Sequence, residues 1–85
     1  MSDLNTRLRF NAVNDEATQF GYRIGVDLMP NTRPRVYRAY AHHHQNEPSL
    51  GQFLCNGASA LEAAEHGVEI LREVVAGTAK WPAEG

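Results

Sequence analysis

The sequence predicts an α+β fold, a two-layer sandwich in which an antiparallel β-meander of three strands is followed by one C-terminal α-helix. Two observations carry this prediction. Residues 19–29 alternate between apolar and polar side chains, which is the period of a strand with one buried face. Residues 60–76 place apolar side chains at helical spacing, directly after a Ser59–Glu62 capping box that marks a helix start. Residues 52–55 are either a short fourth strand or the lead-in to this helix.

The chain has 85 residues, so we expect a single small domain over residues 1–85 with a thin core. Such a core has little room for an internal substrate cavity. A functional site is therefore expected on the surface or between subunits. Residues 77–85 begin with a glycine and contain a proline, and we expect them to form a tail after the helix.

The three main strands are predicted at residues 6–13, 19–29 and 35–44. The first alternates apolar with polar side chains and is followed by turn-forming residues at 14–16. Two prolines in the stretch 30–34 predict a loop between the second and third strands, because proline fixes φ and removes a backbone donor.

The inward face of the third strand has two interpretations. One face carries Tyr37, Ala39, Ala41 and His43, and the other carries Val36, Arg38, Tyr40, His42 and His44. We expect the first face to point toward the helix. Small side chains there let a helix approach the sheet closely, and the guanidinium of the arginine on the other face then stays in water.

The helix at 60–76 has an apolar arc of about 180°, whereas a stripe of about 100° is enough to pack on one sheet. The excess width predicts a further cover, either from the tail that carries Trp81 or from a second copy of the chain. Ile70, Val74 and Trp81 are therefore the candidate interface of a homodimer. The acidic stripe is interpreted as the solvated side of the helix: Glu62, Glu65, Glu69 and Glu73.

The net charge is −2, so a general attraction to nucleic acid is not expected. The charge is uneven, because residues 1–44 carry six arginines against four acids (+2) and residues 45–85 carry two basic residues against six glutamates (−4). The single Cys55 rules out an intrachain disulfide and fits a reducing compartment. Without a signal-like N-terminus or an apolar run of about 20 residues, we expect a soluble cytoplasmic protein with no membrane partner.

Three consecutive histidines end the third predicted strand. His42 and His44 share one face of a regular strand, about 6.5–7 Å apart, and His43 points the other way. Two imidazoles at that spacing can hold a metal ion if a third ligand such as Glu47 joins them. The simpler interpretation is that the imidazoles are solvated, so we predict no metal or other cofactor. A pH-sensitive or phosphate-contacting role is a further alternative.

Cys55 lies just before the predicted helix, where a helix N-terminus can activate a thiol and a histidine can complete a nucleophilic pair. Because no third, orienting residue can be assigned to such a pair, we interpret Cys55 as a small, part-buried hydrophobic residue. The stretch 56–59 offers backbone N–H groups at the helix start, but it lacks the glycines and the lysine of a phosphate-binding loop. Capping of the helix is its simpler role.

The sheet face that points away from the helix carries the main functional hypothesis. Arginine, tyrosine and histidine side chains share it, and glycines at 21 and 25 favour close approach by another backbone. We predict a small non-catalytic interaction or regulatory module, expected as a homodimer, that binds a macromolecular partner through this face. The partner is a protein or a second copy of the chain, and the predicted contact residues are Arg7, Arg9, Arg23, Arg38, Tyr40, His42 and His44.

A nucleic-acid-binding βββα domain that uses the same face is an alternative. Three strands followed by one helix, with Leu50-Gly51-Gln52-Phe53 ahead of the alanine-rich stretch Ala60–Ala64, resemble the element order of plant AP2-type and integrase arm-type DNA-binding domains. The resemblance covers about residues 20–75 in order and composition only, and the dense Arg/Trp strands of those domains are missing here. It implies that phosphates or bases are contacted by Arg7, Arg9, Arg23 and Arg38.

A metal-dependent or histidine-based small enzyme is the second alternative. An 85-residue monomer hardly provides a pocket, so this hypothesis requires an active site in a cleft between two subunits. The sequence contains no motif that names a reaction.

Overall fold

The computed structural model describes residues 3–43 and 51–83. The described residues form two helices and three strands, with the bounds α1 Asp3–Gln19, β1 Tyr22–Leu28, β2 Tyr37–His43, β3 Gln52–Gly57 and α2 Ala60–Ala76. The predicted α+β class is confirmed, and the chain contains one helix more than predicted.

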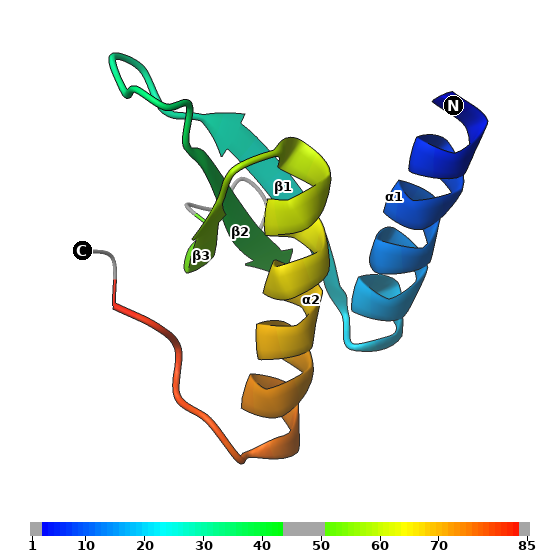
Figure 1. Cartoon of the computed structure of the whole chain (residues 1–85). Helices are drawn as coiled ribbons and strands as arrows, with labels where there is room; N and C mark the ends of the chain where they lie inside the picture. Colours follow the sequence, from blue (N-terminus) through cyan, green and yellow to red (C-terminus); the bar gives the residue numbers. More distant parts are fainter. Residues whose placement is uncertain (1–2, 44–50, 84–85) are drawn as a thin grey trace.

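The strands form an open antiparallel sheet in the order β1-β2-β3 (Figure 1). The strands predicted at 19–29 and 35–44 are present as β1 and β2. β1 is shorter at both ends and β2 begins two residues later, and His44 lies outside the described residues. The stretch at 52–55, which the sequence left between strand and lead-in, belongs to the third strand, β3.

The prediction of a strand at residues 6–13 and a turn at 14–16 is wrong, because both lie inside α1. Leu8, Phe10 and Ala12 alternate as in a strand, but the residues that face the core have a helical spacing. Phe10, Val13 and Ala17 follow one another at intervals of three and four residues, and all three pack into the core. The element order is therefore αβββα, which differs from the βββα order on which the resemblance to DNA-binding domains rested.

The bounds of α2 follow from its two caps, as predicted. At the start, the Ser59 hydroxyl accepts a hydrogen bond from the backbone N–H of Glu62 at 3.1 Å. At the end, Gly77 adopts the left-handed conformation with φ 83°. Its N–H donates to the Val74 carbonyl at 3.1 Å and the following N–H of Thr78 donates to the Glu73 carbonyl at 2.9 Å. This arrangement ends the helix and satisfies its last carbonyl groups.

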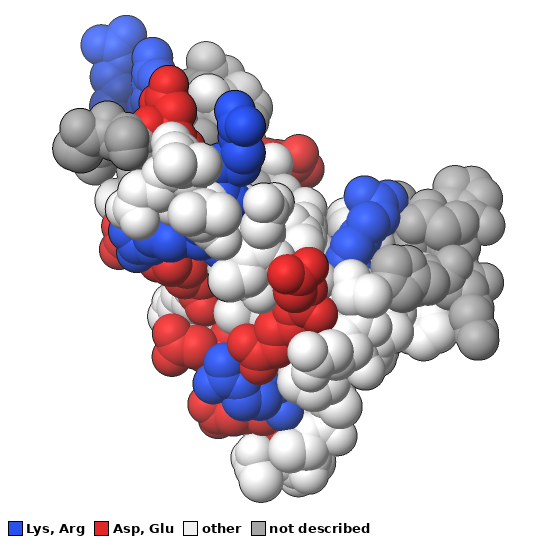
Figure 2. Space-filling view, turned by 90° about the vertical axis from the view of Figure 1, so that its right-hand side faces the viewer, with Lys and Arg blue, Asp and Glu red and all other residues white. Residues whose placement is uncertain are grey.

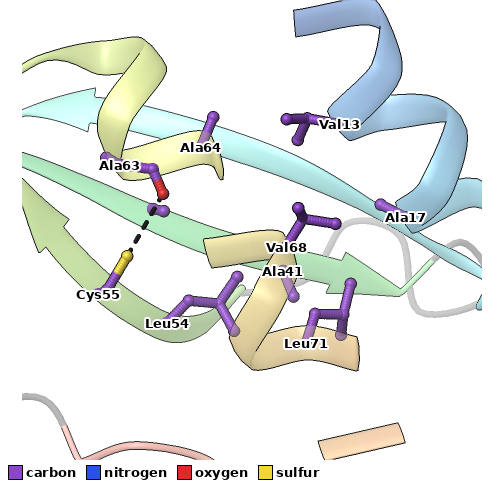
Figure 3. Packing of buried hydrophobic residues seen from close by; sticks show 10 residues of the cluster. Val13, Ala17, Ala41, Leu54, Cys55, Ala63, Ala64, Val68 and Leu71 are labelled. Atoms are coloured by element: carbon purple, nitrogen blue, oxygen red, sulfur yellow. Dashed lines mark hydrogen bonds between the residues drawn. The ribbon is translucent and has the colours of Figure 1, made fainter. Parts of the chain in front are cut away.

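α2 packs across one face of the sheet, α1 lies beside α2 and against the edge strand β1, and the core lies between these elements (Figure 3). Ala39 and Ala41 of β2 are buried, so the expected inward face of this strand is confirmed. Their small side chains let α2 come close, since a β-carbon on Gly67 would lie 3.0 Å from that of Ala39. Leu54 and Leu71 are the largest fully buried side chains.

A β-bulge interrupts the pairing of β2 with β3. Ala39 pairs with Cys55 and Tyr40 pairs with Phe53, so Leu54 is an extra residue in β3. As a result, Leu54 and Cys55 are both buried against α2, although adjacent strand residues normally point to opposite faces. Phe53 pairs with Tyr40, and both side chains lie on the face of the sheet that points away from α2.

Part of the wide apolar arc of α2 is covered within the chain, whereas Val75 is 46% exposed. On one flank α1 lies alongside α2 and contributes Val13 and Ala17 to the core. On another, the tail returns so that the Trp81 ring lies 5.8 Å from that of Tyr22, measured between ring centroids. The sequence offered the tail and a second copy as alternatives, and the structure contains the tail together with a helix that was not predicted.

Candidate interaction surface on the sheet

The face of the sheet opposite α2 is the candidate site, and we call it the open sheet face. Strand register arranges its side chains in three rows that run across the strands. The polar row is Asp27, Arg38 and Asn56, and the aromatic row is Gly25, Tyr40 and Phe53. The third row pairs Arg23 with His42.

The aromatic row continues into a cluster of three rings. The Tyr40 centroid lies 6.2 Å from that of Phe53, with the planes 71° apart. It lies 6.5 Å from that of His42, with the planes 48° apart. The Arg38 guanidinium carbon lies 5.4 Å from the centroid of Phe53, within the range of a cation–π contact. The centre of the open sheet face is therefore aromatic, with a cation resting on one of its rings.

Two glycines make room for the imidazole of His42. A β-carbon on Gly25 would lie 3.1 Å from its Nε2, and one on Gly51 would lie 2.7 Å from its Cε1. The imidazole therefore lies between β1 and the residue that precedes β3. This close packing is the physical reason for glycine at both positions, and it places the third ring next to Tyr40.

The charged groups of the open sheet face flank its aromatic centre. Arg23 is exposed and Arg38 is half-buried, one on each side of the aromatic row. Asp27 is exposed and pairs in register with Arg38. The described part of this face thus presents two guanidinium groups and one carboxylate, although the whole chain has a net charge of −2.

The sequence identified Arg23, Arg38, Tyr40 and His42 as surface residues of one sheet face, and the register brings them together there. Phe53 was missed. Its place depends on the bulge at Leu54, because a regular β3 reaching back from Cys55 would turn Phe53 toward the core. The local sequence around Phe53 contains no pattern that would assign its side chain to the open sheet face.

The expectation that Arg7 and Arg9 share this face is wrong, because both lie on α1. Arg9 instead forms a bidentate ion pair with Glu65 of α2, with Nε–Oε2 2.9 Å and Nη2–Oε1 2.5 Å. Glu65, which the sequence assigned to a solvated stripe, thus has a partner on another helix.

A second bidentate pair joins Arg72 of α2 to Glu16 of α1, with Nε–Oε2 2.5 Å and Nη2–Oε1 2.8 Å. The hydrogen bond from Arg72 holds the pKa of the Glu16 carboxyl below its usual value, although partial burial acts in the opposite direction. Both pairs span the same sequence separation, so the two helices run side by side in the same direction. Between the pairs lies a groove of about 410 Å³, and acidic and basic atoms are mixed over this side of the molecule (Figure 2).

The residues named for a dimer interface lie partly in the core. Ile70 and Trp81 are half-buried and pack against it. Val74 is also half-buried, whereas its neighbour Val75 is 46% exposed. The largest exposed apolar side chains in the described part of the chain include two others on α1, Leu4 and Leu8, which are 61% and 56% exposed.

The metal hypothesis concerns His42, His44 and Glu47, of which only His42 lies among the described residues. His42 and His43 point to opposite faces, and the ring of His43 packs edge-on against Tyr22 at 4.9 Å. Within residues 3–43 and 51–83, no three His, Cys, Asp or Glu side chains lie close enough together to hold a metal ion. The other proposed ligands, His44 and Glu47, lie outside the described residues.

Cys55 is buried at 7% exposure, and its thiol donates a hydrogen bond to the Ala63 carbonyl at 3.3 Å (Figure 3). Burial raises the pKa of this thiol above its usual value. A raised pKa keeps the sulfur protonated at neutral pH, which is the opposite of what a nucleophile requires. Cys55 therefore has the environment of a small core residue, in agreement with the simpler interpretation of the sequence.

Comparison with models of protein families, with curated proteins and with solved structures gives no match. Neither helix in the described part of the chain combines the length and the apolar character needed to cross a membrane. The functional argument therefore rests on the geometry of the open sheet face.

Proposed function

We propose that the protein is a small non-catalytic interaction module that binds a macromolecular partner through the open sheet face. One observation carries the proposal: α2 covers one face of the sheet, and arginine and aromatic side chains lie together on the other face. Tyrosine and arginine are enriched among the residues that dominate binding energy in interfaces. A cytoplasmic location is part of the proposal, since a lone buried cysteine fits a reducing compartment.

The position of the open sheet face's residues on paired strands also supports a binding role. These residues come from three paired strands, and His42 is held between two glycines. Side chains held on strands lose less conformational freedom on binding than side chains on loops. Binding to a preformed surface of this kind requires little rearrangement of the backbone.

Affinity capture from a cell extract tests the proposal. The wild-type protein is compared with Arg23→Glu, which reverses the charge of an exposed residue of the open sheet face. Arg7→Glu is the matched control, because it makes the same change at an exposed position of α1. Circular dichroism and thermal melting confirm that all three proteins are folded.

The expected result is a set of macromolecules that the wild type and Arg7→Glu retain and that Arg23→Glu loses, measured by mass spectrometry and by nucleic-acid content. Equal capture by all three proteins would show that the open sheet face does not bind the partner.

We also propose that the protein self-associates through the exposed side chains of Leu4 and Leu8. The two leucines lie one turn apart on α1, so their exposed side chains form one continuous apolar strip. Light scattering after size exclusion is expected to give a dimer for the wild type and a monomer for the Leu4→Lys/Leu8→Lys variant. A monomeric wild type at high concentration would contradict this proposal.

A further inference from the structure

We infer that the partner of the open sheet face is single-stranded RNA, with bases stacked on Tyr40 and Phe53 and phosphates paired with Arg23 and Arg38. The inference rests on the proposed function and names the class of partner for the same surface. Its three supports are the aromatic row, the charge on either side of that row, and the polar row beside it.

The aromatic row has the chemistry of a stacking platform. Proteins that bind single strands combine aromatic side chains, on which successive bases stack, with a positively charged path for the backbone. Tyr40 lies between Phe53 and His42, and the planes of neighbouring rings are tilted by 71° and 48°. Because these rings are not parallel, they do not form a closed stack with one another. Tyr40 and Phe53 are half-buried, so part of each side chain is open to a base.

The positions of the arginines fit a strand that crosses the aromatic row. Arg23 and Arg38 lie in the rows on either side of Tyr40, so a chain whose base stacks on Tyr40 brings a phosphate near each guanidinium. Arg38 already rests on the ring of Phe53 at 5.4 Å, which orients its planar group beside a stacked base. Two guanidinium groups on one face can contact phosphates although the net charge of the whole chain is −2.

The polar row favours RNA over DNA. Asp27 and Asn56 flank Arg38 in register and offer a carboxylate and an amide. A carboxylate repels a phosphate, but it accepts a hydrogen bond from a ribose 2′-hydroxyl, the group that distinguishes RNA from DNA. An acidic protein segment explains the arginines as well as RNA does, but it gives no role to the adjacent aromatic rings or to Asp27.

Fluorescence anisotropy with labelled ten-nucleotide probes is the test. The probes are a single-stranded RNA of mixed sequence, the DNA of the same sequence, and the RNA duplex. We expect the single-stranded RNA to bind most tightly. With two phosphate contacts, the slope of log K against log salt concentration is expected to be about −1.4, because each contact with a single strand contributes about −0.7. Arg23→Gln is expected to reduce the slope to about −0.7.

Removal of a ring tests the stacking role. Tyr40→Leu and Phe53→Leu keep apolar bulk and remove the aromatic face, and each is expected to weaken RNA binding by about 5- to 150-fold. Phe10→Leu is the matched control, because it removes a half-buried ring from α1, off the open sheet face. It is expected to leave RNA affinity unchanged, with thermal melting as the check on folding.

Amide chemical shifts of the wild-type protein provide a measurement that needs no variant. Addition of the RNA probe is expected to shift resonances of β1, β2 and β3 around Arg23, Tyr40 and Phe53 more than those of α1. Shifts confined to the helices, or equal losses of affinity in Phe10→Leu and Tyr40→Leu, would overturn the assignment of this surface.

The outcomes separate the inference from the function on which it rests. If none of the probes binds at low salt, where phosphate contacts are strongest, RNA is not the partner. The proposed function still stands in that case if Arg23→Glu loses a captured protein that Arg7→Glu retains. Equal affinity for the DNA probe would overturn the choice of RNA, and tighter binding of the duplex would overturn the single-stranded mode.

Discussion

Gly57 at the end of β3 and Ala63 in the first turns of α2 approach so closely that a β-carbon on Gly57 would lie 2.7 Å from the backbone nitrogen of Ala63. The contact is with backbone, which cannot move aside as a flexible side chain can. The same helical turn accepts the hydrogen bond from the Cys55 thiol at the Ala63 carbonyl. The junction of β3 with α2 is therefore held by contacts that leave no space for a side chain at Gly57.

Gly57→Ala is expected to destabilise the protein by about 1–3 kcal/mol, because overpacking forces the backbone to shift. Asn56→Ala is the control at the neighbouring exposed position, with an expected change within about 0.5 kcal/mol. Urea unfolding followed by circular dichroism measures both. Equal stability of Gly57→Ala and wild type would show that the strand and the helix are farther apart in solution.

The core and the exposed leucines give a second pair of variants. Leu71 is fully buried, so Leu71→Ala is expected to cost about 2–5 kcal/mol through lost burial and the cavity left behind. Leu8→Ala makes the same change at a side chain that is 56% exposed, and its expected effect is within about 0.5 kcal/mol. Urea unfolding at two protein concentrations measures both. The value for Leu8→Ala applies to the monomer at low protein concentration. A larger loss at high concentration is expected if Leu8 contributes to the proposed self-association.

Much of the fold could be predicted from the sequence where a pattern and a local signal agree. The apolar spacing of residues 60–76 coincides with a capping serine and a terminal glycine, and the helix begins and ends where they indicate. In β1 the alternation over 22–28 has a single interpretation. The choice of Ala39 and Ala41 as inward residues also succeeded, because small side chains are needed where a helix packs closely.

The first helix could not be predicted in the same way, because its buried surface is small. Val13 and Ala17 are its only buried residues, while Leu4 and Leu8 are exposed, so its apolar residues do not form a clear helical stripe. Residues 6–13 instead show the alternating period of a strand. The absence of glycine and proline from residues 3–19 is the signal that favours a helix. Because residues 6–13 were predicted to form a strand, Arg7 and Arg9 were assigned to the open sheet face, whereas they lie on α1.

The open sheet face was predicted only in part, because regular alternation places some of its residues and tertiary packing places others. Residues of β1 and β2 are placed by regular alternation, which the sequence displays. Phe53 is placed by a bulge, whose position depends on how Leu54 and Cys55 both fit under α2. That fit is a property of tertiary packing, and the local sequence does not encode it in a period.

The ion pair between Glu16 and Arg72 predicts acid sensitivity of the helix pair. Because the hydrogen bond from Arg72 lowers the pKa of Glu16 in the folded state, the pair stabilises the fold above the usual carboxyl range. This contribution decreases as pH falls below about 4.3, the ordinary pKa of a glutamate. It is lost once the pH has fallen through the lowered pKa of Glu16 in the folded state. Arg72→Gln is therefore expected to lower the urea midpoint at pH 7, with a difference from wild type that closes toward pH 3.

The effect is expected to be smaller than that of Gly57→Ala, since exposed ion pairs contribute little and salt screens them. Arg7→Gln is the control, because it removes a guanidinium from an exposed position of the same helix pair. A difference between Arg72→Gln and wild type that is equally large at pH 7 and pH 3 would rule out the Glu16 carboxylate as its origin.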